Sequence, residues 1–167
     1  SIETFFAFAN GAKAARPDAD VRIVWTQSWA DVAKAKEQAL ALIANKADLI
    51  FHNANNGAQG VFDAVNEKEL GVWAFGANDD QAAMAPEVVL ASAVLDIPKV
   101  FLDVAQEVKE GRFDGRTKIL GMPAGYVWVA YNKALESKIP AEVRKKTDEI
   151  AESIRKGSLK VERRVLK

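Results

Sequence analysis

Between residues 21 and 76, three short apolar runs alternate with two segments of helical periodicity, an order that few folds accommodate. The runs are VRIVW (21–25), DLIFH (48–52) and VWAFG (72–76). They are apolar almost throughout, which is typical of strands buried on both faces, whereas strands with one face in water alternate apolar and polar residues. Helices that cross between parallel strands cover both faces of their sheet. The sequence therefore predicts an α/β fold with a parallel sheet and helices on both faces.

The two intervening segments have the features of amphipathic helices. Asp31 is a predicted N-cap, because a carboxylate at that position accepts a hydrogen bond from a backbone amide of the first turn. The helix that it opens runs to about Lys46. Its apolar side is formed by Val32, Ala35, Ala39, Leu42 and Ile43. A shorter helix is predicted over about residues 58–67, after a polar loop that contains glycine.

A further helix is predicted over residues 5–15, where a parallel sheet would normally require a strand first. Only the four residues SIET precede it. Either the sheet has an uncovered edge or a strand is missing. We favour a missing strand, because Phe5, Phe6 and Phe8 need more apolar surface than the three following strands provide. We therefore expect polypeptide upstream of Ser1, and without it we expect the three phenylalanines to favour self-association.

The later part of the chain predicts more strands. Residues 88–94 are strand-like, and two short strands are expected at 118–122 and 126–131, on either side of a Pro-Ala-Gly turn. The tryptophans that lie in predicted strands are expected in the core; they are Trp25, Trp73 and Trp128.

Two more helices are predicted in this part. One covers residues 97–111 with Gly111 as its C-cap, and the other opens at Pro140. Each has one apolar stripe that we expect to be buried. The stripes are Val100, Phe101, Val104 and Val108 in the first helix, and Val143, Thr147, Ile150 and Ile154 in the second.

Composition excludes several classes of function. Lys and Arg together number 23 and so do Asp and Glu, so the net charge is zero and the basic surface of a dedicated nucleic-acid binder is absent. The chain has no cysteine, which excludes disulfides, thiolate nucleophiles and thiolate metal sites. It has one histidine, His52, which excludes a metal site built from several histidines. No apolar stretch approaches the roughly 20 residues that a membrane span requires.

Polar side chains follow each of the three predicted strands, at residues 26–29, 53–57 and 77–81. In open α/β sheets, ligands bind outside the carboxyl ends of the strands. The amides, hydroxyls and carboxylates of these loops can fix a polar ligand, and Trp29 offers a face for a ring to stack on. For each residue alone, helix capping is an equal explanation. Three such loops at one edge of the sheet predict a binding surface.

Catalytic arrangements are few. His52 has no second histidine to complete a relay, and Asp79 and Asp80 are adjacent, so in an extended segment their carboxylates point in opposite directions. The segment Gly57–Gly60 has neither of the glycine spacings that cradle phosphate groups. No metal or cofactor is therefore expected, and an enzyme that uses Asp80 or His52 alone is the least favoured hypothesis.

An ordered series of motifs runs through nearly the whole chain: SWADVAKAKEQAL, IFHNANN, GVWAFGANDDQ and VLASAVLDIPKVFLDVAQEVKEGRF. In this order the chain resembles the basic membrane protein family of bacterial solute-binding lipoproteins, which includes purine-nucleoside receptors of ABC importers. The resemblance covers only the later half of a family member. It implies the periplasmic-binding-protein fold of type I, in which two α/β lobes enclose a ligand, here with an incomplete two-lobe architecture.

The resemblance also implies a division of the chain. Residues 1–96 would form the ligand-binding domain of the second lobe without its leading strand. Residues 97–140 would return toward the first lobe, and residues 141–167 would form a C-terminal helix and a basic tail. The implied function is non-catalytic binding of a nucleoside or another small polar solute for an ABC permease. The implied location is the cell envelope, either periplasmic or lipid-anchored at the outer face of the cytoplasmic membrane.

By the same resemblance, the ligand would contact Trp29, Phe51, His52, Asn53, Asn78, Asp80 and Gln81. The polar loops described above add Ser28 and Asn56 to this candidate site. Two positions depart from the pattern of the nucleoside-binding members. Asn78 stands where they carry an aspartate that binds ribose hydroxyls, so that bond would lack charge assistance. Leu95 stands where they often carry a lysine. Both departures bear on nucleoside specificity and leave the receptor interpretation intact.

A second hypothesis comes from another class of protein. Ligand-sensing effector domains of transcriptional regulators share the same lobe design. In that case a helix-turn-helix segment would precede this chain.

Overall fold

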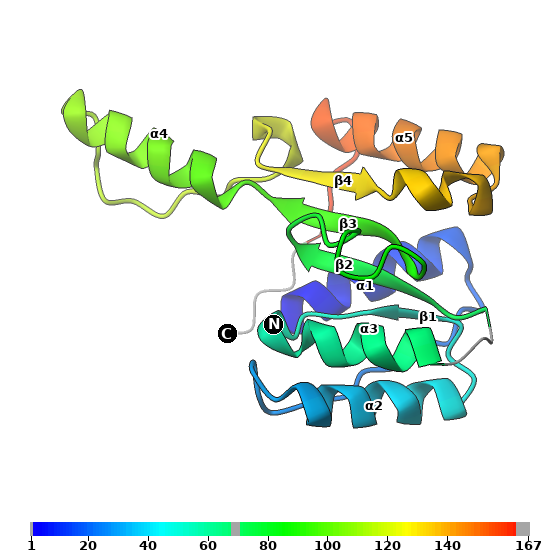
Figure 1. Cartoon of the computed structure of the whole chain (residues 1–167). Helices are drawn as coiled ribbons and strands as arrows, with labels where there is room; N and C mark the ends of the chain where they lie inside the picture. Colours follow the sequence, from blue (N-terminus) through cyan, green and yellow to red (C-terminus); the bar gives the residue numbers. More distant parts are fainter. Residues whose placement is uncertain (1, 68–70, 163–167) are drawn as a thin grey trace. The chain divides into compact units, whose positions relative to one another are not determined.

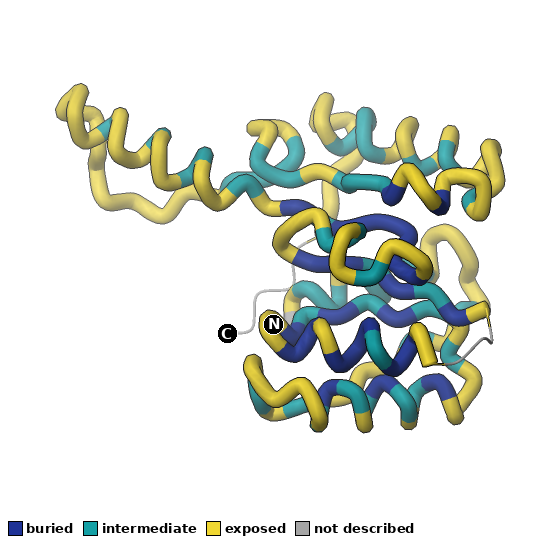
Figure 2. The backbone as a smooth tube through the Cα atoms, in the orientation of Figure 1, coloured by how far each residue is buried: buried dark blue, intermediate teal, exposed yellow. Residues whose placement is uncertain are grey.

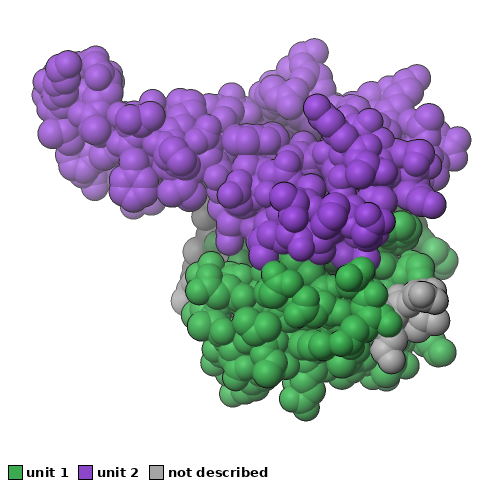
Figure 3. Space-filling model, in the orientation of Figure 1, with its two compact units in different colours: residues 1–74, 160–167 green, residues 75–159 purple. Residues whose placement is uncertain are grey.

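The computed structural model describes residues 2–67 and 71–162, and the chain divides into two compact units (Figures 1 and 3). Residues 1–74 and 160–167 form the first unit, and residues 75–159 form the second. The elements of the first unit are α1 (Ile2–Ala15), α2 (Val32–Ala44), β1 (Leu49–Phe51), the 3₁₀ turn η1 (Asn55–Gly57) and α3 (Ala58–Glu67). Strand β2 (Trp73–Asn78) begins in the first unit and continues in the second. The second unit adds β3 (Val89–Leu95), α4 (Ile97–Lys109), η2 (Met122–Ala124), β4 (Val127–Tyr131), η3 (Lys133–Lys138) and α5 (Ala141–Arg155).

Helices α2 and α3 pack directly against each other in the first unit. The predicted cap is confirmed, since the Oδ1 atom of Asp31 accepts a 2.9 Å hydrogen bond from the backbone N–H of Lys34. The apolar side of α2 buries Ala35, Ala39 and Ile43, which are small enough for a close approach of the partner helix. At Gly60 of α3 the approach is so close that an added Cβ atom would lie 2.0 Å from the carbonyl oxygen of Val32.

Strand β1 has helices on both of its faces. The ring of Phe51 stacks on that of Phe8 in α1, with centroids 5.2 Å apart. The next side chain, His52, meets the edge of Phe62 in α3 at a centroid distance of 5.2 Å. Because successive side chains of an extended segment point to opposite faces, α1 and α3 cover opposite faces here. This confirms the predicted α/β class.

The four strands follow one another in the order β1-β2-β3-β4. Strands β3 and β4 are antiparallel, and their register runs from Ala91 opposite Tyr131 to Leu95 opposite Val127. The tight turn at Gly125, which has a φ of +75°, precedes β4. The strand predicted at 126–131 is therefore confirmed, whereas residues 118–122 form no strand.

Asn132 secures the end of β4 to the preceding strand and loop. Its side chain is 5% exposed, and its Nδ2 atom donates to the carbonyl oxygens of Pro86 and Val89 at 2.8 Å each. Its Oδ1 atom accepts from the N–H of Ala134 at 3.0 Å. A buried amide with three partners stabilises the fold because each partner would otherwise be buried without a hydrogen bond.

We expect Asn132→Ala to lower the free energy of unfolding by about 2–3 kcal/mol, because it leaves two carbonyls and one N–H without their partner. Urea unfolding of the chain, followed by circular dichroism, measures the change. Asn66→Ala is the matched control, since Asn66 is exposed near the end of α3. Equal midpoints for the two variants would contradict this role of Asn132.

The predicted strand at residues 21–25 is wrong for this chain. The segment has no secondary structure, and none of its backbone groups takes part in a backbone hydrogen bond among the described residues. A strand requires a partner along its edge, and the described part of the chain supplies none. Ile23, Val24 and Trp25 are consequently exposed, and Trp25 is not in the core.

Two predicted apolar stripes are less buried than expected. Helix α4 buries none of its residues along its whole length (Figure 2). Phe101 is 72% exposed. Val104 and Val108 are exposed as well, and Val100 is half-buried. Helix α5 likewise buries none of its residues, and Trp128 in β4 is exposed. These stripes were predicted from helical periodicity, which identifies an apolar face but not what covers it.

The exposed apolar surface at the three phenylalanines of α1 is smaller than predicted. Phe5, Phe6 and Phe8 are half-buried, because Phe5 lies against Phe6 at 5.4 Å and Phe8 stacks on Phe51. Among the described residues, a larger set of exposed apolar side chains lies on α4 and the segment that follows it, at Ile97, Phe101, Leu102, Val104, Val108, Phe113 and Ile119. We call these residues the α4 surface.

Candidate functional site

The first predicted loop precedes α2 and is held by hydroxyl groups. Thr26 donates its Oγ1 hydrogen to the carbonyl oxygen of Ser28 at 2.8 Å. The Oγ atom of Ser28 accepts from the N–H groups of Ala30 and Asp31 at 3.2 and 3.1 Å. Ser28 therefore shapes the loop. Trp29 is 59% exposed, so its ring is available to a ligand.

The second predicted loop follows β1. His52 is 5% exposed and its Nδ1 atom accepts from the N–H of Ala54 at 3.3 Å, which requires that nitrogen to be unprotonated. The Nδ2 atom of Asn53 donates to the hydroxyl of Thr4 at 3.4 Å, so this loop is tied to α1. Asn56 is exposed on the 3₁₀ turn.

These two loops meet at Gly57. Its N–H donates to the carbonyl oxygens of Ala54 at 2.9 Å and Trp29 at 3.3 Å. An added Cβ atom at Gly57 would lie 3.3 Å from the Cβ atoms of both Ala35 and Ala54, so the residue is closely packed. The fold thus brings an exposed indole and an exposed amide loop together, beside the first turns of α2 and α3. Such a junction can stack an aromatic ring and hydrogen-bond its polar edge.

The third predicted loop belongs to the second unit. Asn78 is exposed and takes a left-handed conformation with a φ of +71°. The two carboxylates turn toward their own backbone: Asp79 accepts from the N–H of Asp80 at 2.8 Å, and Asp80 accepts from the N–H of Ala82 at 3.1 Å. Gln81 is half-buried and its Oε1 atom accepts from the N–H of Ala77 at 2.9 Å. The loop presents the amide of Asn78 and the carboxylates of Asp79 and Asp80 to solvent.

Two of the predicted residues have their rings engaged within the protein. Phe51 stacks on Phe8, and His52 is buried against Phe62. Within the first unit, the exposed groups of the predicted site are therefore the indole of Trp29 and the amide of Asn56.

Sequence reasoning missed Ser92 and Gly76. Ser92 is buried in β3 and its Oγ atom accepts from the N–H of Gln81 at 3.0 Å. The sequence signal for Ser92 was a serine inside an otherwise apolar strand. A buried hydroxyl destabilises the protein unless it is hydrogen-bonded, so a hydrogen-bond partner could have been expected.

A group of charged residues lies at the start of α4. The Tyr126 hydroxyl donates to Asp103, which also pairs with Lys99. The hydrogen bond from Lys99, followed by that from Tyr126, lowers the pKa of Asp103. The same carboxylate, as the acceptor of its hydrogen bond, raises the pKa of Tyr126. These contacts join α4 to the loop that leads into β4.

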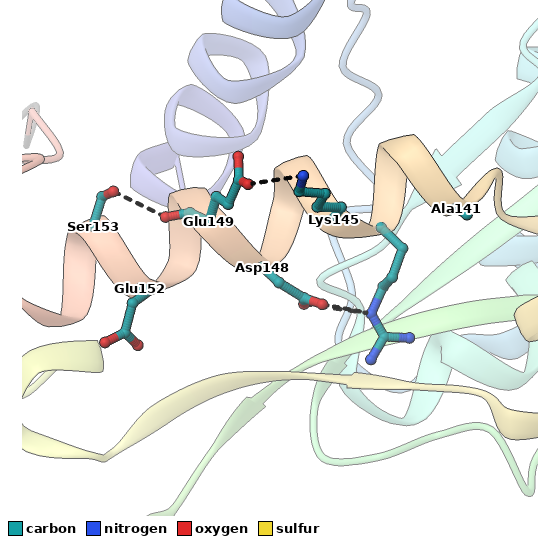
Figure 4. Close-up of a pocket in the computed structure, with 7 residues that line it drawn as sticks. Ala141, Lys145, Asp148, Glu149, Glu152 and Ser153 are labelled. Carbon is teal, nitrogen blue, oxygen red and sulfur yellow. Dashed lines mark hydrogen bonds and ion pairs between the residues drawn. The ribbon is translucent and has the colours of Figure 1, made fainter.

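A shallow groove along α5 is lined by charged side chains (Figure 4). Arg144 pairs with Asp148, and Lys145 pairs with Glu149, each one helical turn apart. Exposed pairs with this spacing contribute little to stability and are typical of a solvated helix face. No residue of the three predicted loops lines this groove.

Two features are absent from residues 2–67 and 71–162. These residues contain no helix that is long and apolar enough to cross a membrane. They also contain no group of three or more His, Asp or Glu side chains that could hold a metal ion.

Comparison with known sequences identifies one family and several relatives. The family model described as ABC transporter substrate-binding protein PnrA-like matches residues 2–160. The chain is 28% identical over 158 residues to a purine-binding protein of Brucella abortus, covering 95% of this chain and 43% of that protein. It is also 28% identical over 158 residues to the ABC transporter nucleoside-binding protein BmpA of Lactococcus lactis subsp. cremoris, covering 84% of this chain and 45% of that protein. The chain spans about half the length of the curated relatives it matches.

Two solved structures share the fold. An ABC transporter solute-binding protein from Aeropyrum pernix superposes with a TM-score of 0.73 at 18% identity, covering 92% of this chain and 50% of that one. A transcriptional activator of the comK gene from Bacillus halodurans superposes with a TM-score of 0.71 at 22% identity, covering 83% of this chain and 46% of that one. At such identities the likeness establishes the fold alone.

Proposed function

Since this chain belongs to the PnrA-like family of ABC transporter substrate-binding proteins, we propose that it forms the second lobe of a solute receptor. The solute would be a small polar molecule, held between this lobe and a first lobe. The family match over residues 2–160 carries the proposal. The junction at Gly57 supports it, because that junction gathers an exposed aromatic ring and exposed amides in the way that ring-binding sites do.

The proposed role requires binding and no catalysis. The family consists of substrate-binding proteins. His52, one of the two residues named by the catalytic hypothesis, is 5% exposed, and its Nδ1 atom accepts a backbone hydrogen bond. A base with that nitrogen occupied and little access to solvent is poorly placed to take a proton from a substrate.

The segment after residue 96 would join this lobe to the first one. We assign residues 1–96 to the ligand-binding lobe, residues 97–140 to a segment that packs on the first lobe, and residues 141–167 to a C-terminal helix and basic tail. The α4 surface supports this assignment, because seven large apolar residues are exposed on one helix and the segment that follows it. An amphipathic helix gains most of its stability by burying its apolar face against a partner.

The complete receptor would deliver its solute to an ABC permease at the outer face of the cytoplasmic membrane, either in the periplasm or through a lipid anchor. Hinge closure around the solute would present the closed form to the permease.

Among small polar solutes we propose a purine nucleoside. Two relatives carry purine-binding and nucleoside-binding names. Taken separately, Trp29 of the first unit is the candidate to stack on a base, and the amide of Asn78 of the second unit is the candidate to hydrogen-bond a ribose hydroxyl. Because Asn78 is neutral, this hydrogen bond would be weaker than one from a carboxylate.

We expect adenosine, inosine or guanosine to bind the isolated chain with millimolar affinity, because one lobe supplies only one wall of the site. Titration followed by ¹H–¹⁵N NMR should shift the signals of the Trp29 indole, Asn56 and Asn78. Trp29→Ala should weaken binding about tenfold or more, which is the usual effect of removing a base-stacking ring.

Trp25→Ala is the matched control, since Trp25 is 55% exposed and lies outside the loops. Asn78→Asp should strengthen the binding of nucleosides but not of free bases, because aspartate also adopts the left-handed conformation and adds charge to the bond with ribose. If no nucleoside or base shifts these signals at millimolar concentration, or if the two tryptophan variants behave alike, the nucleoside proposal is wrong.

The regulator hypothesis has no comparable support. The structure of the Bacillus halodurans activator resembles this chain at 22% identity, which speaks for the fold and not for a role in transcription.

A further inference from the structure

Ser92 connects strand β3 to the third loop. It is 1% exposed, and its Oγ atom accepts a 3.0 Å hydrogen bond from the backbone N–H of Gln81. A hydroxyl buried in an apolar strand destabilises the protein unless it is hydrogen-bonded. Here the hydrogen bond goes to the residue at which the loop Asn78-Asp79-Asp80 ends.

Gln81 connects the other end of the same loop. Its Oε1 atom accepts from the backbone N–H of Ala77 at 2.9 Å, and its Nε2 atom lies 3.6 Å from the Sδ atom of Met84. The side chain of Gln81 therefore reaches back across the three loop residues to the end of β2. Together the two contacts fix the loop at Ala77 on one side and at Gln81 on the other.

Gly76 makes room for both contacts. A Cβ atom at this position would lie 2.4 Å from the Oγ atom of Ser92 and 3.0 Å from the Oε1 atom of Gln81. Real Cβ atoms do not approach that closely, so any other residue would displace the two polar groups from the backbone of β2.

The loop needs such support because its first residue is not in a relaxed conformation. Asn78 has a φ of +71°, a left-handed conformation that asparagine tolerates better than most non-glycine residues but that still places it outside the common backbone regions. Asn78 and Asp80 are both exposed, so nothing buries them in place. The Asp80 carboxylate also accepts from the N–H of Ala82 at 3.1 Å, so the course of the backbone, which the contacts at the two ends of the loop fix, sets where both side chains lie.

We propose that Ser92 and Gln81 are positioning residues for solute binding, which hold the Asn78 amide and the Asp80 carboxylate in one orientation toward the solute. The inference rests on the proposed function. It assigns Gln81 the role of holding the loop backbone in place. Neither residue has to touch the solute for this role.

The test compares the wild-type chain with Ser92→Ala, Gln81→Met and Gln81→Glu by amide hydrogen exchange and by nucleoside titration. In Ser92→Ala we expect the Gln81 amide to exchange about tenfold faster, the effect of losing one hydrogen bond to a buried group. In Gln81→Met we expect the same for the Ala77 amide and a severalfold weaker affinity for nucleosides. Gln81→Glu retains an acceptor oxygen, so it should restore the protection of Ala77.

Ser137→Ala and Gln106→Met are controls at exposed positions. If the two residues only stabilised the fold, their substitution would speed amide exchange throughout the second unit, including α5. Gln81→Glu would then not restore the protection of the Ala77 amide selectively. Unchanged exchange at Ala77 and Gln81 in the variants would overturn the inference even if nucleosides bind. If no solute binds but exchange changes as expected, the proposed function fails while the loop contacts stand, so the two failures are distinguishable.

Discussion

Replacing Gly60 with alanine is expected to lower the free energy of unfolding by about 3 kcal/mol, at the upper end of the usual cost of overpacking. The added Cβ atom would lie 2.0 Å from the carbonyl oxygen of Val32 and 2.9 Å from the backbone nitrogen of Lys36. Both atoms belong to the backbone at the start of α2, so no side chain can rotate to relieve the clash. The two helices would have to move apart and lose part of their packing.

Chemical denaturation of Gly60→Ala and of Gly11→Ala measures this effect against a matched control. Gly11 also lies in a helix, but a Cβ atom there would meet nothing within 4 Å. Because alanine is the better helix former by about 1 kcal/mol, Gly11→Ala should stabilise α1 slightly. Two variants of equal stability would show that α2 and α3 are not as close at Gly60 as the structure places them.

The α4 surface is expected to drive self-association of the isolated chain, and the double variant Phe101→Glu, Val108→Glu should abolish it. Phe101 and Val108 are 72% and 58% exposed on the same helix face, seven residues apart. Burying each against a second copy would contribute about 1.5–3 kcal/mol. Losing both should therefore raise the dissociation constant by at least about a hundredfold.

Sedimentation equilibrium at several concentrations measures the association. Val143→Glu, Ile150→Glu is the matched control, since both residues are exposed on α5 and part of its apolar stripe. If association persists in the α4 variant and disappears in the α5 variant, the two copies make contact through α5 and not through α4. A wild-type chain that is monomeric at all concentrations would refute the expectation.

The site loops and the α4 surface differ in whether they need a first lobe. The loops around Gly57 and Asn78 are each held by hydrogen bonds within their own unit, so their local geometry does not require a first lobe. The α4 stripe buries none of its residues within this chain. In the proposed receptor, a first lobe would therefore add the opposite wall of the site and would cover α4.

The positions of the candidate loops could be predicted in part from sequence because strand ends and helix starts are local features. The loops at Asn56 and Asn78 followed from the order of apolar runs and polar segments, whereas the loop at Trp29 was predicted as the end of a strand at 21–25 that does not form. The engagement of Phe51 with Phe8 could not be predicted, since these residues are far apart in the sequence and their contact depends on where α1 lies. The contact between Ser92 and Gln81 was missed for the same reason, because it joins two segments across a loop.

The amino-acid sequence alone determined the family, the α/β class, the position of most helices and the capping of α2 by Asp31. These properties depend on helical periodicity, capping and motif order, which are set by residues near one another in the chain. Only the tertiary structure decided that residues 21–25 form no strand, that the α4 stripe is exposed and that Ser92 supports the loop at Asn78. The physical reason is that strand pairing and burial each require a partner from elsewhere in the fold, and a local pattern shows that a partner is needed without showing whether it is there.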